Sequence, residues 1–369
     1  MLKGMKFRIY PNKTQLHIIE KTFGCCRLVY NYGLSLRIKS YEDGVSISYK
    51  ETNAMLTDMK CSIDFSFLKE VDSIALQQFL RDLDKAYKNF FSKRASFPKY
   101  KSKHNHHKSY RTQNVNGNIT VVDKYIKLPK LGFVKAKITM PVIGKINNAT
   151  IECTPSGKYF CVLNVECDTP VHTNKGGMVG IDVGIKSFYV DSNGYECPNN
   201  KYLDKTMSKL NKEQRKLSRM VKGSSNYNKQ RIKVARLHEK ITNQRNDFLH
   251  KESLKLVREN QIICTEDLNI KGMVRNHKLA KSINDVSWSK FFSMLEYKAY
   301  FYGTEIIKVP RFYASSQTCN CCGFIDPKVK NLSIRVWSCP SCNTTNHRDL
   351  NAAKNILSKG LEIKLHSVA

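Results

Sequence analysis

The chain has 369 residues, and its 62 Lys and Arg against 31 Asp and Glu give a formal net charge of +31 at pH 7. Hydrophobic residues make up 41% and aromatic residues 10%, which is enough to build a buried core and excludes wholesale disorder. So large a basic excess on a folded chain predicts a polyanionic partner, and the length allows two or three domains.

No run of apolar residues approaches the roughly 18 that a membrane span requires, and the N-terminus lacks the apolar stretch of an export signal. A basic amphipathic helix with Trp and Leu on its apolar face, typical of membrane-surface proteins, is not found either. We therefore expect no membrane partner. The odd number of cysteines, 13, favours a reducing compartment over a disulfide scaffold.

The N-terminal part is predicted to begin with one strand and two helices. Alternating apolar residues from Met5 to Ile9 predict a strand, and Pro11 predicts the turn that follows. Apolar residues at helical spacing predict one helix over about 15–41 and another over about 74–91. Short alternating runs then predict a small β domain, over residues 119–122, 133–138, 149–153 and 159–165. The polar segment 170–177 is predicted to separate two domains.

The C-terminal part is predicted to alternate strands and helices. Residues 178–191 are expected to form two short strands around a glycine-containing bend, and 192–194 a hairpin turn. Residues 205–258 are helical in two parts, broken at 223–225. The remaining elements are a strand over 261–265, a helix over 287–302 and a strand over 304–309. The resulting order, βββ-α-β-α-β, indicates an RNase H-like α/β fold.

Two basic segments are predicted to bind along a nucleic-acid strand. Residues 85–111 hold nine Lys and Arg interleaved with aromatic residues, and 205–240 hold twelve Lys and Arg against two acids. Lys and Arg neutralise phosphates, and aromatic rings stack on unpaired bases. For any single residue, a solvated helix face above a core is the more common explanation. The candidate nucleic-acid-binding residues are Lys85, Lys88, Lys93, Arg94, Lys99, Lys101, Lys103, Arg111, Lys209, Lys212, Lys216, Arg219 and Arg245.

In the second basic segment the charged and apolar residues separate onto two faces of a predicted helix. Lys209, Lys212, Lys216 and Arg219 share one face. The other face is apolar and comprises Met207, Leu210, Leu217 and Val221. Such a helix would rest on a core and present its charge to a nucleic-acid backbone.

Four of the cysteines have the spacing of zinc ligands. Cys319 and Cys322 form one CxxC pair, Cys339 and Cys342 form another, and 16 residues separate the pairs. Two such turns complete a tetrahedral site of four thiolates, which is closed to substrate and therefore structural. Cys321 is interpreted as a bystander. The alternative is four unrelated core cysteines.

Three carboxylates occupy similar settings, at the end of a strand or the start of a helix. Asp182 follows an apolar strand, Glu266 follows another, and Asp349 begins a helix just after the cysteine pairs. Carboxylates gathered at one edge of a sheet can hold one or two Mg²⁺ ions, which activate water for phosphodiester hydrolysis. Taken singly, each acid could instead be a cap or a surface residue, and Asp191, Asp247 and Asp267 are nearby acids with such roles.

These motifs together resemble the transposon-associated TnpB (OrfB) family, whose members are RNA-guided nucleases related to type V CRISPR effectors. The resemblance rests on the acidic motifs at 180–186, 266–269 and 348–353 and on the paired cysteines. It extends to further motifs at 6–11, 23–27, 245–251 and 315–318. It thus covers nearly the whole chain. Family catalytic acids fall on Asp182, Glu266 and Asp349, which the resemblance implies are Mg²⁺ ligands.

The resemblance implies a multidomain α/β and α+β protein with a RuvC-like, RNase H-like nuclease domain and an inserted zinc ribbon. A wedge-like β-barrel with an inserted helical recognition lobe is expected to precede it. The implied divisions are 1–24 and 113–172 for the barrel, 25–112 for the lobe, 173–312 and 343–369 for the nuclease domain, and 313–342 for the ribbon, which would bind target nucleic acid.

The resemblance also implies the reaction and its partners. The expected function is RNA-guided, Mg²⁺-dependent cleavage of DNA by two-metal hydrolysis, with two Mg²⁺ ions, a structural Zn²⁺ and a guide RNA. That RNA would derive from the end of the transposable element, and the target would be double-stranded DNA beside a short motif. The expected location is the cytoplasm of a prokaryote, on the nucleoid when the protein is bound to DNA.

The chain departs from the family pattern at three positions near the third acid. His347 stands where the family commonly has Asp, Asn343 where Gly is usual, and Val336 where Glu is common. None of these departures removes a predicted ligand.

Two other functions are compatible with parts of this pattern. An RNA-guided binding protein that represses without cutting would be favoured by loss of an acid, and all three are present. A DNA strand-transferase or accessory factor in transposition would need a nucleophilic Tyr or its own recognition of element ends. No Tyr here has a supporting pair of His residues in the sequence.

Overall fold

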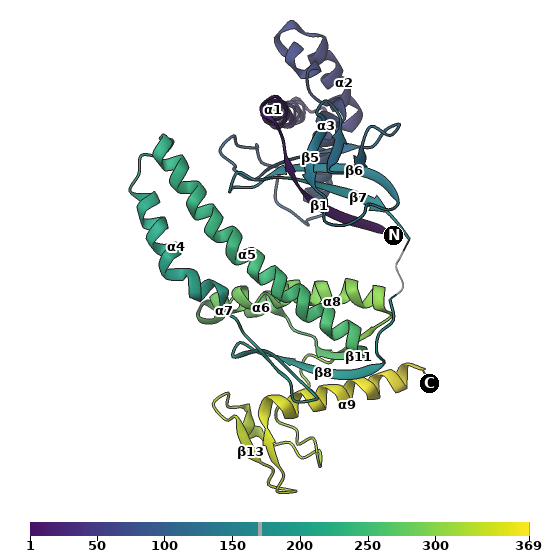
Figure 1. The fold of residues 1–369 in the computed structure, drawn as a ribbon, viewed down its shortest axis with the longest axis vertical. Coiled ribbons are helices and arrows are strands. Elements are labelled where there is room, and N and C mark those ends of the chain that lie inside the picture. Colours follow the sequence, from purple (N-terminus) through teal and green to yellow (C-terminus); the bar gives the residue numbers. More distant parts are fainter. Residues whose placement is uncertain (169–171, 369) are drawn as a thin grey trace. The chain divides into compact units, whose positions relative to one another are not determined.

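The computed structural model of the chain describes residues 1–168 and 172–368. These residues divide into two compact units, Met1–Asp168 and Thr169–Ala369, which we describe separately (Figure 1). The predicted boundary at 170–177 falls partly on residues 170 and 171, which lie outside the described residues. The last residue of this predicted boundary, Gly177, already begins a strand of the second unit.

The first unit combines a β-sheet with helices. Its helices are α1 (Lys13–Glu42), α2 (Tyr49–Cys61), the short 3₁₀ helix η1 (Ile63–Lys69) and α3 (Ser73–Phe91). Its strands are β1 (Leu2–Tyr10), β2 (Lys108–Gln113), β3 (Thr120–Val122), β4 (Tyr125–Leu128), β5 (Gly132–Lys137), β6 (Lys145–Cys153) and β7 (Tyr159–Glu166).

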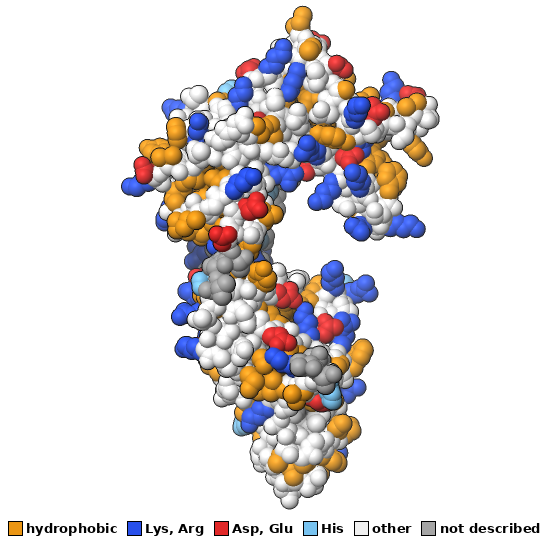
Figure 2. All heavy atoms as spheres, turned by 90° about the vertical axis from the view of Figure 1, so that its right-hand side faces the viewer, with side chains coloured by type: hydrophobic (Ala, Val, Ile, Leu, Met, Phe, Trp, Pro, Cys, Tyr) orange, Lys and Arg blue, Asp and Glu red, His pale blue; other side chains and the backbone are white. Residues whose placement is uncertain are grey.

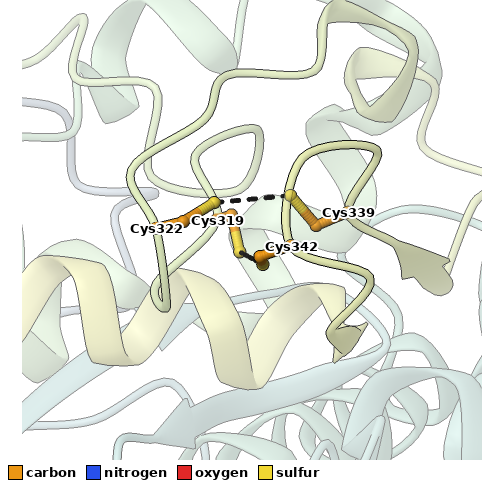
Figure 3. Close-up of side chains that lie close together, drawn as sticks. All are labelled: Cys319, Cys322, Cys339 and Cys342. Carbon is orange, nitrogen blue, oxygen red and sulfur yellow. Dashed lines mark hydrogen bonds between the residues drawn. The ribbon is translucent and has the colours of Figure 1, made fainter.

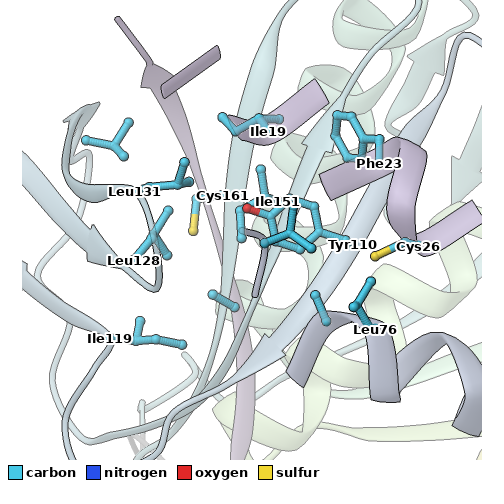
Figure 4. Close-up of a cluster of buried hydrophobic side chains, with 14 of the residues drawn as sticks. Ile19, Phe23, Cys26, Leu76, Tyr110, Ile119, Leu128, Leu131, Ile151 and Cys161 are labelled. Atoms are coloured by element: carbon cyan, nitrogen blue, oxygen red, sulfur yellow. The ribbon is translucent and has the colours of Figure 1, made fainter. Parts of the chain in front are cut away.

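The seven strands pair in the order β2-β6-β7-β1-β5-β4-β3, and every pairing is antiparallel. In β1 every second residue is buried, namely Met5, Phe7 and Ile9. This alternation is typical of an antiparallel strand with one face on the core and the other in solvent. These side chains join apolar residues of α1, α3 and the other strands in one core, part of which Figure 4 shows around Tyr110 and Cys161.

Capping side chains set the starts of the helices in the first unit. At α1 the Asn12 side chain accepts from the Gln15 backbone N–H, and the Gln15 side chain accepts in return from the Asn12 backbone N–H. Ser48 and Glu51 form the same reciprocal box at α2. Each box satisfies two backbone donors that a helix start otherwise leaves without a partner.

The second unit contains a sheet, several helices and a small two-stranded ribbon. Its strands are β8 (Gly177–Val183), β9 (Ser187–Asp191), β10 (Glu196–Pro198), β11 (Asn260–Glu266), β12 (Glu305–Val309), β13 (Val336–Ser338) and β14 (Thr345–His347). Its helices are α4 (Tyr202–Ser218), α5 (Ser225–Glu259), α6 (Ile270–Met273), α7 (His277–Val286), α8 (Trp288–Tyr302), the 3₁₀ helix η2 (Pro327–Lys330) and α9 (Arg348–Val368).

The main sheet of this unit has the order β10-β9-β8-β11-β12, with β8, β11 and β12 parallel and the other pairings antiparallel. Helices α5 and α8 cover one face and α9 covers the other (Figure 1). The sequence predicted this order. Strands β8, β9 and β10 follow one another directly, and helices lead from them to β11 and from β11 to β12. The sheet is therefore an α/β sheet with both faces covered.

Glycines allow α9 to lie very close to the sheet. A Cβ atom at Gly180 of β8 would overlap the Ala353 carbonyl oxygen and the Leu357 backbone nitrogen of α9. A Cβ atom at Gly360 of α9 would overlap the Cys264 sulfur of β11. Close approach of two backbones is a role that only a residue without a side chain can fill. These contacts fix the helix that carries Asp349 against the strands that carry Asp182 and Glu266.

The predicted elements are present, and the structure adds several that the sequence patterns missed. Helix α2, η1 and the strands β2 and β4 had no predicted counterpart. β2 lies within the basic segment 85–111, where charged residues obscured its alternation. The predicted apolar face of 205–221 was wrong at its end, because α4 stops at Ser218 and Val221 lies beyond it with 79% of its side chain exposed.

Among residues 1–168 and 172–368, no helix combines the length and apolar character needed to cross a membrane. None of the 13 cysteines, all of which are described, forms a disulfide. Six of the nine outside the two CxxC pairs are buried, as small apolar residues commonly are: Cys25, Cys26, Cys153, Cys161, Cys197 and Cys264.

Candidate active site and metal centre

The alternation of β8 and β11 places two of the predicted acids on the α9 side of the sheet. In β8, Val179 and Ile181 face the core formed with α5 and α8, so Gly180 and Asp182 face α9. In β11, Ile262 and Cys264 belong to the core under α9, and Glu266 continues that face. The two strands are parallel neighbours, paired through Thr265 and Ile181, so both acids lie at the same edge.

The third acid enters from the helix that covers this face. Asp349 is in the first turn of α9, where the positive end of the helix dipole stabilises a carboxylate. Two buried asparagines on α9 bind the chain that leads into the cysteine ribbon. Asn351 and Asn355 donate hydrogen bonds to the Thr318 carbonyl oxygen at 2.7 and 2.6 Å. The first turn of α9 is thus tied to the segment that begins just after β12.

The Asp182 carboxylate is surrounded by negative charge. Burial raises its pKa well above the usual value for an aspartate, and the nearby carboxylates of Glu266 and Asp349 raise it further. The guanidinium groups of Arg348 and Arg335 act in the opposite direction, more weakly. No hydrogen bond or ion pair to the Asp182 carboxylate is present among the described residues. A half-buried carboxyl group beside two others, without a donor of its own, is poised to bind a cation.

Each of the other two acids has a partner that the sequence patterns did not reveal. Burial raises the pKa of the Glu266 carboxyl group. The Ser315 hydroxyl donates to Glu266 Oε1 at 2.8 Å, and this hydrogen bond partly offsets the rise in pKa. Arg335 donates from Nη1 to both carboxylate oxygens of Asp349 at 3.2 Å. Ser315 lies in the quoted motif 315–318, whereas Arg335 had no signal beyond its place shortly before the second cysteine pair.

The three acids form an oxygen donor set of the kind that Mg²⁺ prefers. Among residues 1–168 and 172–368, the four ribbon cysteines are the one group of three or more Cys, His, Asp or Glu side chains close enough to share a single ion. The three carboxylates are therefore spread more widely.

The acids set aside in the sequence have structural roles. Asp191 accepts hydrogen bonds from the backbone N–H groups of Asn193 and Tyr195 and so closes the turn after β9. Asp247 pairs with Lys251 one turn along α5 at 2.7 Å. Asp267 pairs with Arg311 at 2.6 Å. None of these is in the group around Asp182.

The four cysteines of the two CxxC pairs converge, and their sulfur atoms all lie within 4.8 Å of one another (Figure 3). Cys319 and Cys342 are 3.7 Å apart, and Cys322 and Cys339 are 3.5 Å apart. A tetrahedral zinc with Zn–S bonds of about 2.3 Å has sulfur–sulfur edges of about 3.8 Å, so the cluster fits zinc. Cys321, between the first pair, is exposed and lies outside the group.

Hydrogen bonds prepare part of this cluster for the thiolate form. The Thr344 hydroxyl and backbone N–H lower the pKa of the Cys342 thiol to about 6. The ribbon has a small core in which Val329 and Trp337 pack against Cys319 and Cys339. So small a core needs a metal or another cross-link to hold it together. His347, where the family pattern has Asp, ends β14 opposite Val336 and is exposed.

The candidate nucleic-acid residues of the first unit differ in their availability. Six of them are exposed and have no ion pair with any residue that the structure describes: Lys85, Lys93, Arg94, Lys99, Lys101 and Lys103. Lys88 pairs with Asp84 at 3.0 Å, and Arg111 pairs with Asp82 at 3.2 Å. Lys101 lies over the Tyr30 ring, with its Nζ 4.5 Å from the ring centre. Lys101, Lys103 and Arg111 line a cavity of about 1050 Å³ between α1, α3, β2 and the chain before β2.

The second basic segment presents most of its candidates on α4 and just after it. Lys209, Lys212, Lys216 and Arg219 are exposed, and Leu210 on the other face is buried. Arg245 is different, because it is half-buried on α5 and forms an ion pair with Asp285 of α7. On the face that Figure 2 draws, Lys and Arg side chains occur on both units.

Comparisons with known proteins agree with these features. The model of the OrfB_IS605 family, described as "Probable transposase", matches residues 160–277, and a model described as "Cas12f1-like, TNB domain" matches 288–356. The latter range contains the cysteine ribbon and Asp349. A model described as "Helix-turn-helix domain" matches residues 1–45. That range folds here as one strand and one helix of 30 residues, without the second helix that the description names.

Two relatives match almost the whole chain. A protein of Streptomyces pristinaespiralis named "Putative RNA-guided DNA endonuclease" is 38% identical over 97% of this chain and 89% of its own length. InsQ of Escherichia coli K12, which carries the same description, is 33% identical over 97% of this chain and 92% of its own length. A "TnpB-like protein" of Acanthamoeba polyphaga mimivirus is 29% identical over 62% of this chain. The chain belongs to the TnpB family.

A solved Cas12f1 complex with sgRNA and target DNA also aligns, over 97% of this chain and 99% of that one. The aligned residues are 17% identical and the TM-score is 0.36, which is too low to carry an argument about fold.

Proposed function

We propose that this protein is an RNA-guided DNA endonuclease of a transposable element. It binds a guide RNA and cuts DNA that the guide selects. The observation that carries the proposal is the meeting of Asp182, Glu266 and Asp349 on one side of the sheet. The names of the relatives that match almost the whole chain support the same activity.

The three carboxylates are proposed to hold two Mg²⁺ ions, which would supply Lewis-acid activation of water and charge stabilisation for phosphodiester hydrolysis. Their own contribution is to place negative charge at half-buried positions, where a divalent cation would relieve the repulsion between the carboxylates. Ser315 orients Glu266 through its hydroxyl, and Arg335 holds Asp349. The four thiolates of the ribbon are proposed to bind a structural zinc, and they offer no open position for chemistry.

Both units are proposed to contribute residues to nucleic-acid binding. The proposed domains have the bounds predicted from the sequence: wedge 1–24 and 113–172, recognition lobe 25–112, RuvC-like nuclease 173–312 and 343–369, and zinc ribbon 313–342. The exposed cations of the first unit and of α4 are proposed to hold RNA and DNA backbones. Phosphate contacts of this kind give affinity without sequence preference, which agrees with a protein whose specificity comes from base pairing.

Replacing one acid tests the assignment. In the complex with guide RNA, Asp182→Ala should abolish cleavage of a matched target, because removing a metal-binding carboxylate removes the ions' support. Target binding, measured by gel shift, should stay within about twofold, since phosphate contacts elsewhere dominate affinity.

The matched control is Asp247→Ala, which removes an exposed carboxylate paired only with Lys251. It should leave cleavage unchanged. Cleavage retained by Asp182→Ala would refute the active site. Binding without cleavage by the unmodified complex in Mg²⁺ would favour the repressor alternative.

A further inference from the structure

A large aromatic side chain stands in solvent beside the acidic site. Phe312 is 94% exposed, more than any other large hydrophobic residue among those described. It makes no ring stacking or cation–π contact in the described part of the chain. Covering such a ring gains about 1.5–3 kcal/mol of burial free energy, so a ligand that stacks on Phe312 would be bound more tightly.

The backbone around Phe312 is held on both sides. Arg311 and Phe312 are the central residues of a turn closed by a 3.0 Å bond from the Tyr313 N–H to the Pro310 carbonyl oxygen. Before the ring, Arg311 donates to the Asp267 carbonyl oxygen at 3.2 Å and to its carboxylate at 2.6 Å. After it, Tyr313 turns inward against the core beneath α9. The ring is therefore presented outward by a fixed turn.

The turn lies close to the carboxylates. Val309, the last residue of β12, pairs with Glu266 in the sheet, and Phe312 follows it by three residues. Three residues further on, Ser315 donates to Glu266. Three residues span at most about 11 Å and neighbouring strands lie about 5 Å apart, so the Phe312 backbone is within about 16 Å of the Glu266 backbone. That distance covers a few nucleotides of a DNA strand.

The chemistry of the surroundings selects the occupant. The residues on either side of Phe312 in the turn are Arg311, which pairs with Asp267, and Tyr313, which packs against the core beneath α9. A single exposed ring is far smaller than the contiguous apolar patch of several hundred Å² that marks a protein-docking site. Every nucleobase has a flat face that stacks on an aromatic ring, at about 1–3 kcal/mol per base and with little regard to sequence.

We propose that Phe312 forms a base-stacking subsite of the acidic site, which takes an unpaired nucleobase of the DNA strand being cut, a few nucleotides from the scissile phosphate. This rests on the proposed endonuclease function. The subsite holds the strand in line while the carboxylates act on its backbone, and it accepts any base. An RNA-guided enzyme needs that tolerance, because its target sequence changes with the guide.

The first test is direct contact. The full chain, bound to single-stranded DNA that carries 5-iodouracil, is irradiated and digested, and cross-linked peptides are identified by mass spectrometry. We expect an adduct on Phe312 in the unmodified protein and in Asp182→Ala, because stacking precedes chemistry. The control is Tyr300→Ala, which removes another exposed aromatic residue of the same unit. Tyr300 is exposed near the end of α8, which precedes β12, whereas Phe312 follows β12.

The second test is affinity and turnover. Phe312→Ala should weaken binding of a labelled oligothymidylate about 5- to 100-fold, as loss of one stacked base predicts, and should raise KM for cleavage more than it lowers kcat. Phe312→Trp should restore both. Tyr300→Ala should behave as the unmodified protein.

The two proposals fail separately. Phe312→Ala with unchanged affinity and KM, together with no adduct at Phe312, would overturn the subsite and leave the endonuclease intact. Cleavage retained by Asp182→Ala would overturn the active site, whatever Phe312 does. Equal weakening by Phe312→Ala and Phe312→Trp would also overturn stacking, because the Trp ring stacks on a base and the Ala side chain does not.

Discussion

At the scale of single residues, the acidic site is held together against its own charge. Asp182 is half-buried beside Glu266 and Asp349, and both burial and these neighbours raise its pKa. A carboxyl group with a raised pKa binds a proton more readily in the folded chain than in the unfolded one. The folded state therefore loses stability as pH rises from the ordinary range of an aspartate, about 4, through the raised pKa. Bound cations would remove that penalty.

Neutralising Asp182 should consequently stabilise the protein when Mg²⁺ is absent. In Mg²⁺-free buffer at pH 7.5 without a chelator, so that zinc is retained, Asp182→Asn should melt about 2–4 °C higher than the unmodified protein, the shift that about 1 kcal/mol produces in a unit of this size. The difference should shrink as pH falls toward 4, where the unmodified carboxyl group takes up its proton. Differential scanning calorimetry provides the measurement.

Excess Mg²⁺ should reverse the order of the two proteins, because it binds the intact acids more tightly and stabilises the folded state by mass action. The control is Asp247→Asn, whose carboxylate is exposed and paired with Lys251. If Asp182→Asn melts no higher than the unmodified protein in Mg²⁺-free buffer, the carboxylates do not repel one another as described.

At the scale of elements, α9 and the cysteine ribbon act together on the site. Asn351 and Asn355 bind α9 to the chain entering the ribbon, and Arg335 of the ribbon reaches back to Asp349 at the start of α9. Gly180 and Gly360 seat the helix on the sheet. Disorder in the ribbon would thus release Arg335 and loosen the first turn of α9, so a structural zinc in the ribbon would also support the proposed active site.

Removing zinc should unfold the ribbon and leave the sheet of the second unit folded. The chain has two tryptophans, Trp288 in the main core and Trp337 in the ribbon core. In a Trp288→Phe background, a strong chelator should shift the Trp337 emission to longer wavelength, because the ring becomes exposed to water. Far-ultraviolet circular dichroism should change little, since the helices of the second unit lie outside the ribbon.

Elemental analysis should find about one zinc per chain, which Cys339→Ser should lose and Cys321→Ser should keep. Cys321 is the appropriate control because it is exposed and outside the cluster. An unchanged Trp337 spectrum after metal removal, or equal zinc content in the two variants, would contradict a structural four-thiolate site.

At the scale of the whole molecule, the charge of +31 is far more than the acidic site needs. Lys and Arg are spread over both units, and several candidates in each are exposed and have no ion pair within residues 1–168 and 172–368. Self-repulsion of this size destabilises a compact chain unless a polyanion neutralises it. A permanently bound RNA would do so, and the ribonucleoprotein would then be the working species.

The protein should accordingly purify with RNA at low salt. Sequencing that RNA should give one discrete species that runs past the end of the element, because a guide has a defined end. Ribonuclease treatment should lower the solubility of the protein, and re-added RNA should bind less tightly as salt rises. A random mixture of cellular RNA, with no enriched species, would contradict guiding and leave a basic nuclease.

The sequence by itself determined the long helices and most strands, and it supplied the acids that are proposed for the site. Periodicity reports helices such as α1 and α3 directly, and the cysteine spacing reports the ribbon, because both depend on residues close in the chain. Short, charged strands such as β2 escaped prediction. Their alternation is carried by few residues, and pairing with a partner strand decides whether they form.

Only the tertiary structure decided which groups surround each acid. Asp182, Glu266 and Asp349 are separated by more than 80 residues along the chain, and only parallel pairing of β8 with β11, under α9, puts them on one face. The same pairing reveals Ser315 and Arg335 as partners and leaves Phe312 in solvent beside them. Such contacts depend on how strands and helices pack across long stretches of chain, which local patterns of residues do not encode.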